Sequence, residues 1–234
     1  MTPIREKENF LIFGSPLIEE AEINEVIECM RSAWIGTGPR AAQFEEDFAA
    51  FKGMNKAVAL NSCTAALHLS YLVADLKPGD EVITTPLTFC ATVNAIIHAG
   101  ATPVLADVDP VTMNIDPNEI EKRVTTRTRA IAPVHFAGRA CNMDAIMSIA
   151  QKHNLKVIED CAHAIETEYK GRKAGTFGDF GCFSFYSTKN IVTGEGGMVL
   201  AKRDEDIARL KMLGLHGMST VSYTHLTLPT KRIV

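Results

Sequence analysis

Short apolar runs alternate with segments of helical spacing through the middle of the chain, from residue 56 to residue 201. Runs of apolar and β-branched residues indicate buried strands, and apolar residues at every third or fourth position indicate amphipathic helices. The pattern predicts strands at residues 57–60, 81–85, 102–107, 129–136, 155–160, 182–186 and 198–201. It predicts helices between them at residues 64–74, 91–99, 117–124 and 143–153.

This alternation predicts the fold class. Strands that alternate with helices at this spacing form a mainly parallel sheet, because each crossover returns the chain to the same end of the sheet. Such crossovers are right-handed almost without exception. We therefore expect an α/β protein with three layers in the order α-β-α, in which helices cover both faces of the sheet.

The pattern also divides the chain into three parts. Residues 1–50 carry two expected helices, at 18–32 and 41–51, on either side of a turn that contains Gly36 and Thr37. Residues 51–218 hold the α/β alternation. Residues 219–234 follow neither the helical nor the strand period, and we interpret them as an atypical tail that does not belong to the native protein.

Composition argues against several classes of protein. The net charge of −4 gives no reason to expect nucleic acid or an anionic membrane as a partner. No run approaches the ~20 apolar residues of a membrane span, and the first residues lack the apolar core of a signal peptide. The six cysteines contain no Cys-x-x-Cys pair, so we expect no disulfide framework and no metal site. These observations favour a cytoplasmic protein.

Two charged residues follow apolar strands closely. Asp160 ends the strand expected at 155–160, and Lys189 comes shortly after the strand expected at 182–186. Open α/β sheets carry their site residues at the carboxyl ends of strands. A lysine amine that can form a Schiff base and an aspartate that can hold a pyridine nitrogen protonated are what pyridoxal phosphate chemistry requires of a protein. The sequence therefore predicts a pyridoxal-phosphate enzyme.

A third segment has both a functional and a structural interpretation. Ser62, Cys63 and Thr64 lie between a strand and a helix, where a hydroxyl group and the first amides of the helix suit a phosphate. The alternative is that Ser62 or Thr64 only caps the helix, as such residues commonly do. The lysine segment downstream favours the phosphate site.

Four segments, in this order, resemble the DegT-like sugar aminotransferase family: NSCTAALH at 61–68, EDCAHA at 159–164, GDFGCFSF at 178–185 and TKNIVTGEGG at 188–197. The resemblance covers roughly residues 10–218. It implies the large domain of the aspartate aminotransferase fold. It also implies a homodimer that moves an amino group from glutamate or glutamine to a nucleotide-linked keto sugar, in the biosynthesis of amino sugars or cell-surface polysaccharides.

The resemblance further implies roles for individual residues. Lys189 would bond to the cofactor and then carry a proton at the substrate carbon, and Asp160 would pair with the ring nitrogen. Phe89 would stack on the ring and His163 would contact it near its hydroxyl group; a core phenylalanine and a structural histidine are the alternatives. The residues implied to bind the cofactor are Ser62, Cys63, Thr64, Ala65, Phe89, Asp160, His163, Ser184 and Lys189.

Three alternatives follow from the same resemblance. The turn with Gly36 and Thr37 is similar to the family's substrate-side loop, but its composition is also that of a plain turn. Related sugar dehydratases carry histidine at the lysine position, so Lys189 argues against that group. The family's chains continue into a small C-terminal domain that is missing here, and their sites take a phosphate contact from the partner subunit. We therefore expect a C-terminally truncated chain that is inactive by itself.

Overall fold

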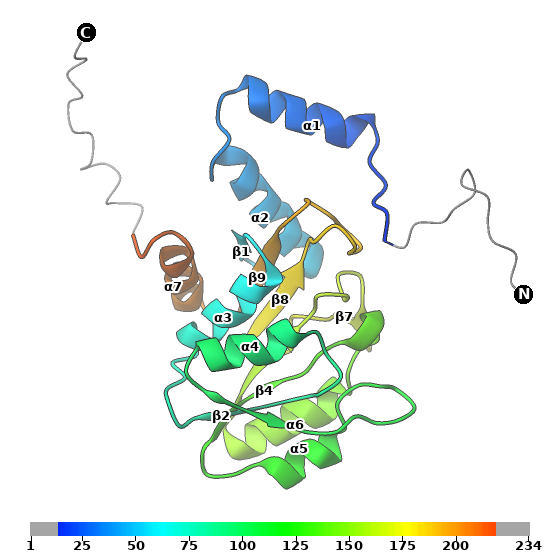
Figure 1. The fold of residues 1–234 in the computed structure, drawn as a ribbon, viewed down its shortest axis with the longest axis vertical. Helices are drawn as coiled ribbons and strands as arrows, with labels where there is room; N and C mark the ends of the chain where they lie inside the picture. Colours follow the sequence, from blue (N-terminus) through cyan, green and yellow to red (C-terminus); the bar gives the residue numbers. More distant parts are fainter. Residues whose placement is uncertain (1–13, 219–234) are drawn as a thin grey trace, which may run out of the picture.

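The computed structural model describes residues 14–218, and its centre is one twisted sheet of seven strands (Figure 1). The strand order is β1-β9-β8-β5-β4-β2-β3, and β9 runs antiparallel to both of its neighbours while the remaining pairs are parallel. This arrangement confirms the mainly parallel sheet. The bounds are β1 Ala57–Leu60, β2 Glu81–Thr84, β3 Thr102–Leu105, β4 Thr128–Ala132, β5 Lys156–Asp160, β8 Phe180–Ser184 and β9 Gly197–Ala201.

Helices cover both faces of the sheet, which confirms the three-layer architecture. Helices α3, α4 and α7 pack in one apolar cluster against one face, and α2, α5 and α6 contribute to the two clusters on the other face. The helix bounds are α1 Glu20–Arg31, α2 Pro39–Lys52, α3 Cys63–Val73, α4 Cys90–His98, α5 Pro117–Arg123, α6 Met143–His153 and α7 Asp204–Gly214.

Strand β5 shows how alternation sorts side chains between the two faces. Successive side chains of a strand point to opposite faces of the sheet. Ile158 accordingly packs in the cluster with α3 and α4, while Val157 packs in the cluster with α5 and α6. The same rule sends Asp160 toward α3 and α4 and its neighbour Glu159 toward the opposite face.

Three expected strands differ by two residues or more at an end, and the one expected at 102–107 stops at Leu105. The strand expected at 129–136 is wrong at its end, because β4 stops at Ala132 before Pro133, which has no N–H group to donate to a ladder. The strand expected at 182–186 is shifted, because β8 begins at Phe180 and ends at Ser184. Gly181 weakens the strand pattern in the sequence, but a Cβ there would lie 2.1 Å from a backbone oxygen of Gly175, so the close approach requires glycine.

Two strands and one α-helix were not expected from the pattern. Strands β6 (Glu168–Tyr169) and β7 (Arg172–Lys173) form a hairpin of two residues each, which is too short for a period to be seen. Helix α7 (Asp204–Gly214) buries Ile207 and Leu210 against the sheet. Helix α2 runs through the boundary expected at residue 50 and ends at Lys52. Its Phe48 and Ala49 pack in the core of the α/β part.

The tail expected at residues 219–234, and the first residues considered for a signal peptide, lie outside the described residues. Within residues 14–218, no helix is both long enough and apolar enough to cross a membrane. All six cysteines lie in this range and are free thiols.

Candidate functional site

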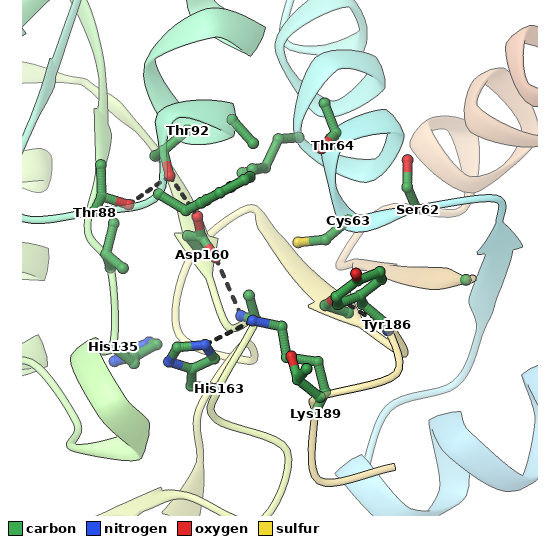
Figure 2. Close-up of a pocket in the computed structure, with 18 of the residues that line it drawn as sticks. Ser62, Cys63, Thr64, Thr88, Thr92, His135, Asp160, His163, Tyr186 and Lys189 are labelled. Atoms are coloured by element: carbon green, nitrogen blue, oxygen red, sulfur yellow. Dashed lines mark hydrogen bonds between the residues drawn. The ribbon is translucent and has the colours of Figure 1, made fainter. Parts of the chain in front are cut away.

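A cavity of about 570 Å³ lies at the carboxyl ends of β5 and β8, between the first turns of α3 and α4 (Figure 2). This volume falls in the range of small-molecule sites. All the residues expected to bind the cofactor line it except Ala65. The lining residues that were expected are Ser62, Cys63, Thr64, Phe89, Asp160, His163, Ser184 and Lys189.

The first turn of α3 forms one wall of the cavity. The Ser62 hydroxyl accepts a hydrogen bond of 3.1 Å from the Ala65 amide, so Ser62 caps the helix, as the structural alternative predicts. The Ala65 amide therefore has a partner already. The amides of Cys63 and Thr64 belong to the helix start, where N–H groups lack partners within the helix and can bind an anion. A Cβ at Gly197 would lie 2.6 Å from the Cys63 nitrogen, so glycine lets β9 approach this turn.

Asp160 lies on the cavity floor with 5% of its surface exposed. One carboxylate oxygen accepts a 2.7 Å hydrogen bond from the Thr92 hydroxyl, and the other accepts a 3.1 Å bond from the Ala162 amide. Thr92 in turn lies 2.7 Å from the Thr88 hydroxyl. A carboxylate offers about four lone-pair sites, so Asp160 retains acceptor capacity toward the cavity that it lines.

Lys189 and His163 point toward each other across the cavity (Figure 2). The Lys189 Nζ lies 2.6 Å from the His163 Nε2. Burial and the nearby Lys189 lower the pKa of His163, so its imidazole is neutral near pH 7 and accepts a hydrogen bond from the lysine. The backbone amide of Lys189 donates to the Tyr186 carbonyl at 2.9 Å, which holds the turn after β8.

Phe89 and the turn with Gly36 and Thr37 have different positions relative to the cavity. Phe89 is the N-cap residue of α4, lines the cavity and is 78% exposed, so the alternative of a core phenylalanine is wrong. Gly36 and Thr37 are exposed between α1 and α2 and are not among the lining residues. The Trp34 indole donates to the Thr37 carbonyl at 3.1 Å, which is a local contact of the turn.

Glu159 is fully buried on the opposite side of β5 from the cavity. Its carboxylate accepts hydrogen bonds from His135 Nε2 at 3.0 Å and from three backbone amides at 2.7–2.8 Å, those of Gly175, Phe177 and Gly178. These donors lower the pKa of Glu159 against the effect of burial. Glu159 begins one of the four segments that carry the family resemblance, but neither its type nor its position indicated a role.

Glu159, His135 and Cys161 lie close enough together to hold a metal ion. The hydrogen bonds argue against one. His135 Nδ1 accepts the Cys141 amide at 3.1 Å, so it carries no proton. The proton of the neutral ring is then on Nε2, which donates it to Glu159 and has no lone pair for a metal. The group is therefore a buried hydrogen-bond network.

Several lining residues were missed from the sequence. Thr88, Thr92, His135, Tyr186 and Glu195 also line the cavity, and the two threonines are joined to Asp160 by hydrogen bonds. The two threonines flank the expected start of the helix that follows Phe89, and this position was the available signal. Nothing in the sequence tells which strand they would face.

Comparison with known proteins places the chain in a family. Residues 16–231 match the DegT/DnrJ/EryC1/StrS aminotransferase family. The spore coat polysaccharide biosynthesis protein SpsC of Bacillus subtilis is 52% identical, over 94% of this chain and 57% of its own length. GDP-perosamine synthase of Caulobacter vibrioides is 44% identical, over 88% of this chain and 56% of its own length.

The fold agrees with the solved structure of a sugar aminotransferase. Spr1654 of Streptococcus pneumoniae, described as a sugar aminotransferase and solved in its pyridoxal phosphate form, superposes with a TM-score of 0.86 at 36% identity. The match covers 89% of this chain and 59% of that one. The chain thus spans little more than half the length of these relatives. The chain belongs to the DegT/DnrJ/EryC1/StrS aminotransferase family.

Proposed function

We propose that this chain is the cofactor-binding part of a pyridoxal-phosphate-dependent sugar aminotransferase. The observation that carries the proposal is that Lys189 and Asp160 line one cavity together with the start of α3. Pyridoxal phosphate has an aldehyde, a ring nitrogen and a phosphate group, and the three features offer a partner for each. The exposed face of Phe89 suits a flat ring. The residues present therefore fit the cofactor.

The residues would divide the work between binding and proton transfer. When bound, the cofactor supplies an aldehyde that takes up an amine and a ring that accepts electrons from the substrate carbon. The Asp160 carboxylate favours the protonated ring nitrogen, because an opposite charge at short range stabilises it. The amides of Cys63 and Thr64, with the hydroxyls of Thr64 and Ser184, would bind the phosphate.

Lys189 has two roles in this proposal. Its Nζ would hold the cofactor in the resting enzyme, and as a free neutral amine it would remove and return a proton at the substrate carbon. His163 holds that amine by the 2.6 Å contact at Nε2. Lys189 is also the residue that argues for amino transfer and against the related dehydratases, in which histidine takes its position.

We infer that the acceptor of the whole protein is a nucleotide-linked keto sugar and that the donor is glutamate or glutamine. The name of GDP-perosamine synthase supports a nucleotide-linked sugar, and the name of SpsC supports a role in polysaccharide biosynthesis. A homodimer in the cytoplasm is part of the same inference. The turn with Gly36 and Thr37 remains our proposal for a substrate-side contact in that larger assembly.

Covalent trapping tests the proposal. Mixing the protein with pyridoxal phosphate should produce a new absorbance band, and borohydride should fix the cofactor on the peptide that contains Lys189. Lys189→Ala should abolish the label, while Lys202→Ala, which removes an exposed lysine that does not line the cavity, should leave it intact. A label on another lysine, or no band at all, would contradict the proposal.

A further inference from the structure

Asp160 is connected to the start of α4 by a chain of two hydroxyl groups (Figure 2). The Thr92 hydroxyl lies 2.7 Å from one Asp160 oxygen, and the Thr88 hydroxyl lies 2.7 Å from the Thr92 hydroxyl. Thr92 is fully buried, and Asp160 is 5% exposed. Short bonds between buried groups are screened little by water, so this contact has a strong influence on the carboxylate.

The direction of the chain follows from the chemistry of its end. An ionised carboxylate only accepts hydrogen bonds, so Thr92 must donate its single hydroxyl proton to Asp160. The Thr92 oxygen is then free to accept, and Thr88 donates to it. The order is therefore Thr88 to Thr92 to Asp160. Both hydroxyl dipoles point their positive ends toward the carboxylate.

The same turn of helix also carries Phe89. Phe89 is the N-cap residue of α4, and its carbonyl accepts the Thr92 amide at 3.2 Å. Thr88 precedes it directly in the chain. One short segment therefore carries both an exposed aromatic ring that lines the cavity and the hydroxyl that holds the Asp160 carboxylate. A ring stacked on Phe89 and hydrogen-bonded to Asp160 would be held on one face and at one edge. Both contacts would depend on the same short segment of the chain.

We propose that Thr92 is a positioning residue, whose hydroxyl, oriented by Thr88, holds the Asp160 carboxylate toward the ring nitrogen of pyridoxal phosphate. This inference rests on the proposed function. With one oxygen bonded to Thr92 and the other to the Ala162 amide, the carboxylate is restrained from rotating. Its remaining lone pairs have a defined direction, and a bond to the ring nitrogen then costs less conformational entropy.

Two purely structural roles for Thr92 predict different results. If it only fills space, valine, which has nearly the same shape, should replace it without loss. If its hydroxyl only links α4 to β5, removing that hydroxyl should weaken the binding of every ligand of the cavity by the same factor. A positioning role instead predicts a loss that depends on the nitrogen of the ring.

The test compares pyridoxal phosphate with its 1-deaza analogue, in which carbon replaces the ring nitrogen. We expect Thr92→Val to raise the Kd for pyridoxal phosphate about tenfold, as the loss of one hydrogen bond to a charged group implies. Thr92→Ser, which keeps the hydroxyl, should restore binding to within about twofold. The Kd for the deaza analogue should be the same in the original protein and in both variants. Titration of cofactor absorbance or fluorescence measures all six values.

Equal losses for the two ligands, or no loss for either, would overturn the inference. Thermal unfolding without ligand checks that each variant is folded. If Thr92→Val does not fold, Thr88→Val decides in its place, because it removes only the outer hydroxyl and should show a smaller loss of about threefold with the same dependence on the ring nitrogen. Failure of the proposed function is distinct: the original protein would then form no borohydride-stable label on Lys189.

Discussion

Glu159 and Asp160 are adjacent carboxylates on β5 with opposite surroundings. Glu159 is fully buried, and its partners are His135 and three backbone amides. Asp160 faces the cavity, and its partners are the Thr92 hydroxyl and the Ala162 amide. A backbone amide can only donate, whereas a hydroxyl group can donate or accept. Glu159 is therefore surrounded by groups that can only donate. Asp160 is held in part by the Thr92 hydroxyl, which could turn and accept a hydrogen bond instead.

The difference teaches which carboxylate is structural. Glu159 uses all of its acceptor capacity to hold the loop before β8, whose Gly175, Phe177 and Gly178 all donate to it. It has nothing left to offer a ligand. Asp160 keeps acceptor capacity toward the cavity. Two acidic residues with adjacent numbers thus serve stability and chemistry separately, because strand geometry sends them to opposite faces.

The largest effect on stability is expected for Glu159→Gln. The NH2 group of glutamine would point its hydrogens at N–H groups that can only donate. About two buried donors would then lack an acceptor, and each costs about 1–3 kcal/mol. We expect the free energy of unfolding to fall by roughly 3 kcal/mol. Urea denaturation measures this change. A loss below about 1 kcal/mol would show that the loop before β8 rearranges to accept the amide.

The matched change, Asp160→Asn, should affect stability little and cofactor chemistry strongly. Thr92 can reverse its hydroxyl and accept from the new amide while Thr88 reverses with it, so unfolding free energy should change by less than about 1 kcal/mol. The charge that favours a protonated ring nitrogen is lost, so cofactor binding should weaken and the half-reaction with an amino donor should slow by about 100-fold or more. Stopped-flow absorbance measures the rate in the whole protein. Unchanged turnover would mean that Asp160 is not the ring partner.

A smaller, pH-dependent effect on the free energy of unfolding is expected for Lys52, on the same side of β5 as Glu159. Lys52 is buried, donates to the Ile165 carbonyl at 2.9 Å and lies 4.5 Å from the centre of the Phe183 ring. Burial lowers the pKa of Lys52 to about 8, which is below the ordinary value of 10.5. Between these two values the unfolded chain binds more protons than the folded one, so the free energy of unfolding rises with pH in this window.

Lys52→Met should remove this contribution. From pH 8 to pH 10.5, the window set by the two pKa values of Lys52, the original protein should gain roughly 2 kcal/mol relative to the variant. Urea denaturation at several pH values measures the difference, and subtraction cancels the other groups that titrate there. A pH-independent difference would show that Lys52 is protonated equally in both states.

Much of the fold was predictable because periodicity reports which faces are buried. The strands at Ala57–Leu60 and Lys156–Asp160 and the helix at Met143–His153 were found nearly to the residue, since each has an apolar face against the core. The end of β4 at 132 and the start of β8 at 180 were not. They depend on Pro133 and on the close approach of two backbones at Gly181, which have no periodic signal.

The candidate site shows the same division. Asp160 and Lys189 were identified from the sequence, because a charged residue just past an apolar strand marks the sheet edge where ligands bind. Thr88, Thr92 and His135 were not, because common polar residues gain meaning only from what they face. The contact between Lys189 and His163 joins residues 26 positions apart, which local pattern cannot foresee.

By itself the sequence determined the succession of the main strands and helices along the chain, the layered α/β class and the residues that end strands at the sheet edge. These depend on local periodicity and on the chemistry of single side chains. Only the tertiary structure decided that Glu159 is saturated with donors while Asp160 is held by Thr92 and open to a cavity. Hydrogen-bond partners are set by which segments the sheet brings together, and that depends on contacts between residues far apart in the chain.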